Sequence, residues 1–380
     1  MNSLEGAHVL AERDQKRIII CGPIARPGQP SRGGFQSANL RLASVLETLG
    51  FRVECWRYWD GDGNILKKSW SHFRQYMRLA WLLAMSRSKS SAVHFTPLLE
   101  QFIALEFVLF LVARIKGYRI VLDLRAGGRF ERFTSRARVY RFLVKRALET
   151  ADFITFEGLP YDEPIGRLAP HVPRRYLPNF VPASLLHQRA RSGGEPGPQL
   201  IYVGQLSEPK GIREAAMTLA VVQGTFPSAG LTLVGRSVDP DLDQAIESIR
   251  LPPGALKYTG ALTFDEILAA LDRSHYFVFL SRWRSEGHSN ALTEAMARGC
   301  VPVCTDQGFN AQVVGDSGLV ARREDTPATI AQWITSNWMK EFWLGLSRKS
   351  VSRVEALFTD EAVRKILQEI YTEEFFASRS

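Results

Sequence analysis

The 380-residue sequence has few cysteines: only Cys21, Cys55, Cys300 and Cys304, with no CxxC pair among them. So small and scattered a set argues against a disulfide framework and against a cysteine-rich zinc site. Long hydrophobic runs are also absent, since the most hydrophobic stretch, 98–117, contains an uninterrupted apolar run only over 107–113, far shorter than the ~20 residues that span a bilayer. The first residues show no apolar signal core. We therefore expect a cytoplasmic chain without a transmembrane helix, in a reducing compartment.

Acidic residues are scarce in the first half of the chain. Residues 1–200 hold 30 Lys and Arg against 17 Asp and Glu, a balance of +13. Residues 201–380 hold 18 against 22, a balance of −4. Asymmetry of this kind indicates that one half meets an anionic partner. The length favours about two domains, because single cores stop growing near 250–300 residues.

Two segments concentrate the basic excess. Segment 67–89 interleaves six Lys and Arg with aromatic residues, among them Trp70 and Trp81, and segment 125–146 contains eight Lys and Arg and one acid. Basic amphipathic helices with tryptophans suit an anionic membrane surface, so we expect a peripheral protein on the inner face of the cell membrane. The alternative is a solvated helix face over a packed core. No RRM, KH, helix-turn-helix or zinc-finger pattern supports a nucleic-acid partner.

Short apolar runs alternate with helical patterns along the whole chain, which predicts an α/β fold with two parallel sheets. The expected strands are 17–21, 52–56, 92–95, 119–124 and 152–156, followed by 200–204, 231–235, 256–260, 276–280 and 301–304. Segment 189–199 is rich in Gly and Pro and predicts a linker. We therefore expect one domain at 1–188, a second at 200–357, and an amphipathic helical segment at 358–380.

Two glutamates, Glu286 and Glu294, stand on either side of a predicted helix start. The helix SNALTEAMARG would be capped by Ser289 or Asn290 and ended by Gly299. Ligands of doubly wound sheets bind beyond the carboxyl ends of the strands, and the free N–H groups of this helix suit a phosphate. Acids before and behind a phosphate can accept hydrogen bonds from sugar hydroxyls, which describes a nucleotide sugar. The alternative without a ligand is that Glu286 is a solvated loop charge and Glu294 a charge on the helix surface.

The segment EG-x6-EAMARGCVPV resembles the signature of the family-four glycosyltransferases, the glycosyl transferases group 1, which are retaining enzymes of the GT-B fold. Other segments resemble the family in the same order: 33–54, 177–181, 203–215, 231–236, 258–271 and 305–320. The resemblance implies two Rossmann-like doubly wound domains facing across a cleft, with a C-terminal helix returning to the N-terminal domain. It also implies transfer of a sugar from a nucleoside diphosphate sugar to a glycan or lipid-linked acceptor, in surface polysaccharide or glycolipid synthesis.

By the same resemblance, Glu286 contacts the donor sugar, Lys210 faces the charge that develops on the leaving phosphate, and Glu294 binds the ribose. The other implied donor contacts are Gly33 and Gly34 in the first glycine loop, Gly235, Arg236 and Leu262 near the base, and Gly287, His288, Ser289, Asn290, Ala291 and Leu292 along the phosphates.

The chain departs from the family pattern at Gln205, where the family carries an arginine five residues before the lysine. Arg282 or Arg284 is a candidate replacement for that cation. Arg125 falls near the place where relatives carry a catalytic histidine, and it is a candidate acceptor-side or phosphate contact. The Asp-x-Asp patterns at 60–62 and 239–241 have structural explanations, so we expect no metal and no cofactor.

Two other functions stay open at this point. A GT-B relative can epimerise or hydrolyse nucleotide sugars without transferring them, and a non-catalytic nucleic-acid-binding protein could use the basic N-terminal half. The residues do not distinguish the donor base, the sugar or the acceptor, because the expected base contacts come from the backbone.

Overall fold

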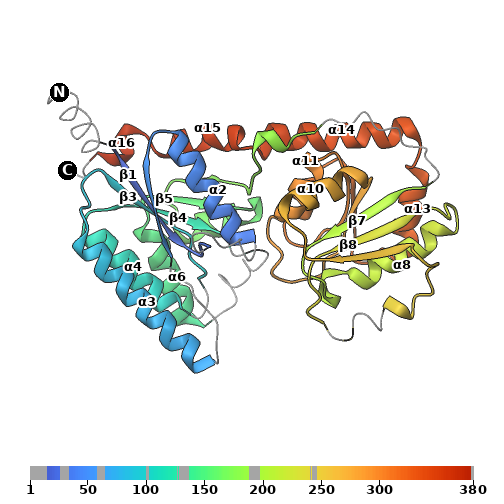
Figure 1. The fold of residues 1–380 in the computed structure, drawn as a ribbon. Coiled ribbons are helices and arrows are strands. Elements are labelled where there is room, and N and C mark those ends of the chain that lie inside the picture. Colours follow the sequence, from blue (N-terminus) through green and yellow to red (C-terminus); the bar gives the residue numbers. More distant parts are fainter. Residues whose placement is uncertain are drawn as a thin grey trace, which may run out of the picture. The chain divides into compact units, whose positions relative to one another are not determined.

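A computed structural model of the chain describes residues 15–25, 34–57, 65–99, 102–125, 127, 137–187, 197–239, 241 and 246–377, with backbone alone for 65–69 (Figure 1). The chain forms two compact units: residues 1–178 with 363–380, and residues 179–362. Each unit contains a six-stranded parallel sheet combined with helices. The predicted α/β fold with two doubly wound parallel sheets is therefore confirmed.

The first unit has the strand order β2-β1-β3-β4-β5-β6. Its strands are β1 Arg17–Gly22, β2 Arg52–Arg57, β3 Ser91–Phe95, β4 Arg119–Leu124, β5 Phe153–Phe156 and β6 Arg174–Tyr176. Its helices before residue 178 include α2 Gly34–Thr48, α3 Ile65–Met85, α4 Ile103–Ile115, α6 Arg138–Thr150 and α7 Asp162–Leu168. The central strands are buried almost throughout, which explains why they read as continuous apolar runs in the sequence.

The second unit has the strand order β12-β11-β10-β7-β8-β9. Its strands are β7 Gln199–Val203, β8 Gly230–Val234, β9 Leu256–Gly260, β10 Tyr276–Phe279, β11 Val301–Thr305 and β12 Leu319–Ala321. Its helices include α8 Ile212–Gln223, α10 Phe264–Arg273, α11 Asn290–Ala297, α12 Asn310–Val314, α13 Pro327–Ser336 and α14 Lys340–Leu357. The sequence did not predict β6 or β12, because three-residue strands carry too short a pattern to recognise.

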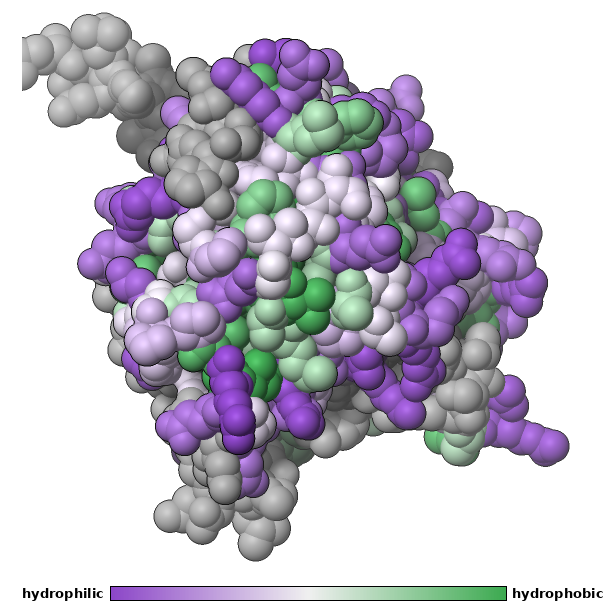
Figure 2. Space-filling view, turned by 90° about the vertical axis from the view of Figure 1, so that its right-hand side faces the viewer, coloured by the Kyte–Doolittle hydropathy of each residue, from purple (hydrophilic) through white to green (hydrophobic). Residues whose placement is uncertain are grey.

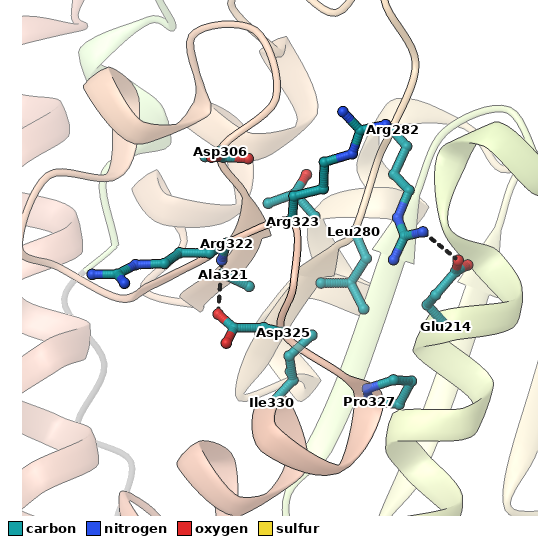
Figure 3. A pocket seen from close by; sticks show the side chains of 11 residues that line it. Glu214, Leu280, Arg282, Asp306, Ala321, Arg322, Arg323, Asp325, Pro327 and Ile330 are labelled. Atoms are coloured by element: carbon teal, nitrogen blue, oxygen red, sulfur yellow. Dashed lines mark hydrogen bonds and ion pairs between the residues drawn. The ribbon is translucent and has the colours of Figure 1, made fainter.

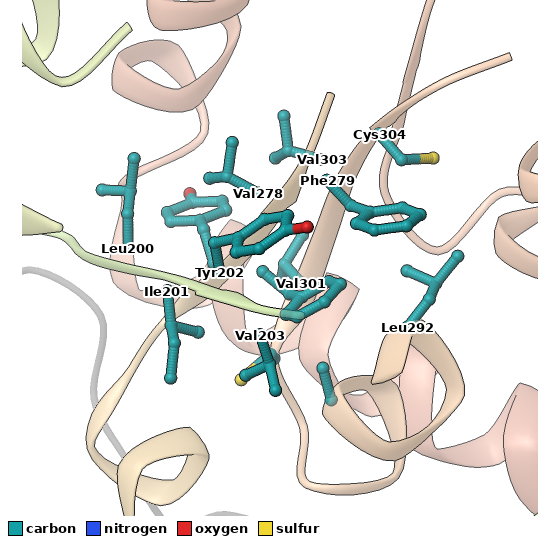
Figure 4. Packing of buried hydrophobic residues seen from close by; sticks show 14 of the residues in the cluster. Leu200, Ile201, Tyr202, Val203, Val278, Phe279, Leu292, Val301, Val303 and Cys304 are labelled. Carbon is teal, nitrogen blue, oxygen red and sulfur yellow. The ribbon is translucent and has the colours of Figure 1, made fainter. Parts of the chain in front are cut away.

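The core of the second unit fixes the helix that follows β10. Buried side chains from β7, β10 and β11 pack together, and the rings of Tyr202 and Phe279 stack with their centroids 6.0 Å apart (Figure 4). Leu292 of α11 is fully buried in the same cluster, on the side of Phe279 and Cys304. The start of α11 is thus anchored to the carboxyl ends of the central strands.

Residues 179–187 belong to the second unit, although the sequence analysis assigned them to a domain at 1–188. The side chain of Asn179 donates a hydrogen bond to the carbonyl of His288 at 2.7 Å. The N–H of Val181 donates to the carbonyl of Phe358 at 2.9 Å. Most of the predicted linker 189–199 lies outside the described residues.

The C-terminal segment returns to the first unit, as predicted, because residues 363–380 belong to it. The amphipathic segment forms two helices, α15 Asp360–Ile370 and α16 Glu373–Phe376, where the sequence predicted one. Thr372 ends the continuity, since its side chain caps α16 by accepting from the N–H of Phe375 at 3.1 Å. Tyr371 lies between the two helices, and its ring packs beside Phe51.

A buried polar cluster ties this segment to the first sheet. The hydroxyl of Tyr371 lies 2.7 Å from His94 Nδ1, and His94 Nε2 lies 3.2 Å from Asp123 Oδ2. Asp123 also accepts from Arg125 Nε at 2.5 Å and from the hydroxyl of Thr155 at 2.9 Å. Burial disfavours the charged carboxylate, but the charge of Arg125 and the hydrogen bond from His94 outweigh it, so the pKa of Asp123 falls from 3.8 to about 2.

This cluster makes the stability of the first unit sensitive to acid. A carboxyl whose pKa is lowered on folding stabilises the native state above its unfolded pKa, and this contribution disappears as pH falls through the folded pKa. Asp123 should therefore contribute about 2 kcal/mol at neutral pH that is lost between about pH 4 and pH 2. In urea titrations, the difference in unfolding free energy between the native chain and Asp123→Asn should shrink by about that amount over this interval. A difference that stays constant with pH would contradict the assignment.

Candidate functional site

The loops that follow β7, β8 and β10 are joined at the carboxyl edge of the second sheet. The N–H of Leu206, after β7, donates to the carbonyl of Arg236, after β8, at 2.9 Å. The N–H of Arg282, after β10, donates to the carbonyl of Pro209 at 2.8 Å. These backbone hydrogen bonds hold the three loops in fixed positions, as a preformed ligand site requires.

Glycine is required at two points where these loops meet. Gly211 has φ +77°, and a Cβ built there would lie 2.1 Å from the carbonyl oxygen of Leu280. Gly235 has φ +143°, and its Cβ would lie 1.7 Å from the carbonyl oxygen of Gly204. Both the backbone conformation and the space exclude a side chain, so the two glycines set how closely the loops approach.

Lys210 and Glu286 form an ion pair across this edge. Lys210 Nζ lies 2.8 Å from Glu286 Oε2, and the two side chains are 18% and 10% exposed. The hydroxyl of Ser281 donates to the same oxygen at 2.6 Å. The Lys210 ammonium also lies 5.9 Å and 6.0 Å from the ring centroids of Phe279 and Trp283. A cation and an acid predicted to act on one ligand are therefore neighbours.

The helix α11 begins beside this pair. Ser289 is its N-cap and accepts from the N–H of Leu292 at 3.3 Å, while Gly299, with φ +73°, follows its last turn. The predicted start and stop of this helix are confirmed. Asn290 and Ala291 precede Leu292 in this first turn, and N–H groups at the start of a helix are of the kind that bind anions. Glu294 lies one turn further on and is partly exposed.

His288 and Asn179 hold the approach to α11. The ring of His288 is buried, with Nε2 2.8 Å from the hydroxyl of Thr293, and it meets the ring of Phe358 edge-on at 5.0 Å. Asn179 was not among the site residues predicted from the sequence, although its side chain donates a hydrogen bond to the carbonyl of His288. The segment LPNFV, 177–181, is one of those that resemble the family, and the polar asparagine within it could have indicated a role at the site.

Gln205, which stands where the family carries an arginine, is exposed, and its backbone carbonyl contacts β7. Its carbonyl accepts from the hydroxyl of Tyr202 at 2.9 Å. Burial, with a smaller effect from the charge of Glu286, raises the pKa of Tyr202 well above its ordinary value, so this phenol stays a donor. Arg284 is exposed, and Arg282 Nη1 lies 3.9 Å from Glu214 Oε1. Neither arginine is held beside Lys210 by a described ion pair.

A small pocket of the second unit is lined in part by Leu280 and Arg282, which follow β10 (Figure 3). In Figure 3 the side chain of Arg282 turns toward Glu214, while the backbone N–H of Arg322 donates to Asp325 at 2.7 Å. The lining residues are Glu214, Leu280, Arg282, Thr305, Asp306, Ala321, Arg322, Arg323, Asp325, Pro327 and Ile330. Because Lys210 and Glu286 are not among them, the pocket is not the centre of the candidate site.

The other predicted residues divide between the two units. In the second unit, Gly235, Arg236 and Leu262 follow β8 and β9, and Gly287 lies between Glu286 and the helix cap. In the first unit, Gly34 begins α2, whereas Gly33 lies outside the described residues. Arg125 is 4% exposed and is held by Asp123 at the end of β4. The described residues hold no group of three or more His, Cys, Asp or Glu placed to bind a metal ion.

Comparison with known proteins gives a family match over much of the second unit. Residues 197–337 match the family model described as "Glycosyl transferases group 1". The chain is 29% identical over 145 residues to the GDP-mannose:cellobiosyl-diphosphopolyprenol alpha-mannosyltransferase of Xanthomonas oryzae, covering 36% of this chain and 37% of that protein. The matches of this chain to curated relatives span about a third of the length of each relative.

Solved structures match nearly the whole chain. Sucrose-phosphate synthase from Thermosynechococcus elongatus has a TM-score of 0.72 at 17% identity, covering 95% of this chain and 100% of that chain. Anabaena HepE in complex with UDP-glucose has a TM-score of 0.67 at 14% identity, covering 93% and 98%. At these identities the likeness establishes the fold. Residues 197–337 are thus similar to the glycosyl transferases group 1, and the chain has the GT-B fold of these structural neighbours.

Proposed function

We propose that this chain is a retaining glycosyltransferase that moves a sugar from a nucleoside diphosphate sugar to a glycan or lipid-linked acceptor. The observation that carries the proposal is the ion pair of Lys210 and Glu286 beside the start of α11. It joins a cation for a phosphate, an acid for sugar hydroxyls and the N-terminal end of a helix at one edge of a sheet.

The ion pair gives each partner a distinct part in the reaction. When the bond between the anomeric carbon and the phosphate oxygen breaks, negative charge builds on the leaving diphosphate, and the Lys210 ammonium stabilises it. Among the described residues, the hydrogen bonds of the Glu286 carboxylate go to Oε2, so Oε1 can accept from a sugar hydroxyl. The acceptor hydroxyl forms the new bond on the same face and passes its proton to the leaving phosphate.

Relatives support a nucleotide-sugar donor without fixing which one. One relative is named for GDP-mannose and a diphosphopolyprenol acceptor, and one structural neighbour holds UDP-glucose. A lipid diphosphate acceptor would fit the basic excess of residues 1–200, because its charge would be attracted to that half. We therefore place the enzyme in surface polysaccharide or glycolipid synthesis, in the cytoplasm and peripheral to the inner face of the membrane. An epimerase or hydrolase is the second candidate.

The function is tested by measuring nucleotide release from UDP-, GDP- and ADP-sugars, with and without a polyprenyl-diphosphate-linked saccharide. A transferase should release nucleotide from one donor class, at least about tenfold faster when the acceptor is present. Full activity in EDTA is expected, because the proposal uses Lys210 where other folds use a metal ion. Nucleotide release at the same rate with and without the acceptor would identify a hydrolase. Conversion of the donor sugar without nucleotide release would identify an epimerase.

A further inference from the structure

Helix α3 has two opposite apolar faces, and only one of them is covered. His72, Tyr76, Leu79 and Leu83 are buried against the first unit. Trp70, Phe73, Trp81 and Met85 are exposed by 62%, 41%, 62% and 69%, and their spacing places them along the other side of the helix. The two tryptophans therefore lie on the exposed face of the helix and not in the core beneath it. Large aromatic residues left in solvent along a stripe call for a partner.

The neighbouring helix α4 extends the same kind of surface. Its exposed residues are Ala104, Val108, Leu111 and Ile115, the last 82% exposed, and all four are apolar. Its charged residues lie elsewhere: Glu106 is buried and accepts from the backbone of Leu98 and Leu99, and Arg114 pairs with Asp152. An exposed helix stripe without any charge is unusual for a solvated surface, where polar residues normally alternate with apolar ones.

Helix α6 adds positive charge beside these stripes. Its exposed residues are mostly Arg and Lys, together with Val139 and Phe142. The guanidinium of Arg146 lies over the ring of Phe142, 5.5 Å from its centroid. Lys145 and Arg146 also reach Glu149, while Arg138 lies at the start of the helix. The exposed face of this helix therefore combines cationic and apolar side chains.

These three helices pack in the order α3, α4, α6 and lie side by side at the lower left of Figure 1. They carry nine of the twenty exposed large hydrophobic side chains among the described residues, although they contribute only a small part of the chain. The end of the second unit seen in Figure 2 differs, with hydrophilic residues surrounding a limited hydrophobic patch. Exposed apolar groups are thus concentrated on one layer of the first unit.

We propose that the outer face of α3, α4 and α6 is a membrane-docking surface, whose occupant is a bilayer containing anionic lipids. The apolar residues of α3 and α4 enter the level of the headgroups and upper acyl chains, and the cations of α3 and α6, Arg74, Arg78, Arg138, Arg141, Lys145 and Arg146, meet lipid phosphates. None of the described helices has the length and apolar character of a membrane span, so this contact is interfacial.

Charge favours a bilayer over a second copy of the chain. In a two-fold dimer through this face, the same patch would meet itself. The arginines and lysines of α6 would then face those of the partner, with Glu149 as the one acid on that helix. An anionic bilayer instead supplies counter-charges and an apolar interior together. The inference concerns a face made only of first-unit helices and stands whether or not the transfer reaction is correct.

The test is co-sedimentation of the full chain with vesicles of phosphatidylcholine containing about a third phosphatidylglycerol. Binding is expected at low salt and should fall at 0.5 M salt, because screening weakens the cationic contacts. Trp70→Ala/Trp81→Ala should reduce binding at least about tenfold, since two aromatic side chains leave the interface. Arg138→Gln/Lys145→Gln should weaken binding and reduce its salt dependence. The matched control is Met339→Ala/Phe342→Ala, which removes two similarly exposed side chains of the second unit, one from the N-cap of α14 and one from its first turn, and should leave binding unchanged.

Three results would overturn the inference. These are no binding to anionic vesicles at low salt, a loss of binding in the control variant equal to that in the tryptophan variant, or a tryptophan variant that binds like the native chain. Sedimentation velocity without lipid tests the alternative occupant, a second copy of the chain. A dimer that is abolished by Trp70→Ala/Trp81→Ala would assign the face to self-association. Nucleotide release with a water-soluble acceptor should be unaffected by the tryptophan variant. Failure of docking is thereby distinguished from failure of the proposed function.

Discussion

Replacing Lys210 with alanine is expected to lower the kcat/KM for donor-dependent sugar transfer at least about 100-fold. Removing one preorganised donor that faces developing charge typically has an effect of this size. Lys210 Nζ is held 2.8 Å from Glu286, and its side chain is mostly shielded from solvent. A lost ammonium could therefore not be replaced by water without a large electrostatic penalty.

The control for this experiment is Lys257→Ala, because Lys257 is exposed on β9 of the same unit. It removes the same charge from the chain and should leave kcat/KM within about twofold of the native value. The Lys210 variant also leaves Glu286 as a nearly buried acid without its cation, so its urea unfolding must be measured alongside. A folded Lys210→Ala protein with near-native kinetics would exclude Lys210 from the reaction.

Replacing Gly211 with alanine is expected to destabilise the second unit by about 3 kcal/mol. A side chain at φ +77° disfavours the left-handed backbone by about 1–2 kcal/mol. Its Cβ would also lie 2.1 Å from the carbonyl oxygen of Leu280, so the loops after β7 and β10 must move apart, and overpacking of this kind costs about 1–3 kcal/mol. Activity should fall together with stability, because these loops carry Lys210 and Glu286.

Gly254 provides a matched control for the steric part of this effect. It has φ +81°, but a Cβ built there meets nothing within 4 Å. Gly254→Ala should therefore show only the backbone penalty, about 1 kcal/mol, with unchanged kcat/KM. The measurement is the difference in unfolding free energy between the two variants in urea. Equal destabilisation would mean that the close approach of the loops at Gly211 has no energetic importance.

The sequence predicted those features that depend on local pattern. The buried central strands read as continuous apolar runs, and Ser289 and Gly299 bracket α11 because capping and left-handed stops are determined by single residues. The order of these strands and helices was enough to predict two parallel sheets. The break at Thr372 was missed because the amphipathic period continues across it.

Long-range side-chain partners could not be predicted in the same way. Lys210 and Glu286 are 76 positions apart, and the sequence assigned both to a ligand without indicating that they bind each other. The contact between Asn179 and His288 spans 109 positions, and the one between His94 and Tyr371 spans 277. Such pairs depend on where the strands end in space, which a single sequence does not specify.

The central claim is that a sugar diphosphate binds between Lys210 and the start of α11. The most direct test is a crystal structure of the chain with a bound nucleoside diphosphate, chosen by the donor screen. The account predicts phosphate oxygens within hydrogen-bond distance of Lys210 Nζ and of backbone N–H groups at the start of α11, with Lys210 released from Glu286. A diphosphate bound instead among Arg282, Arg322 and Arg323, with the ion pair intact, would contradict it.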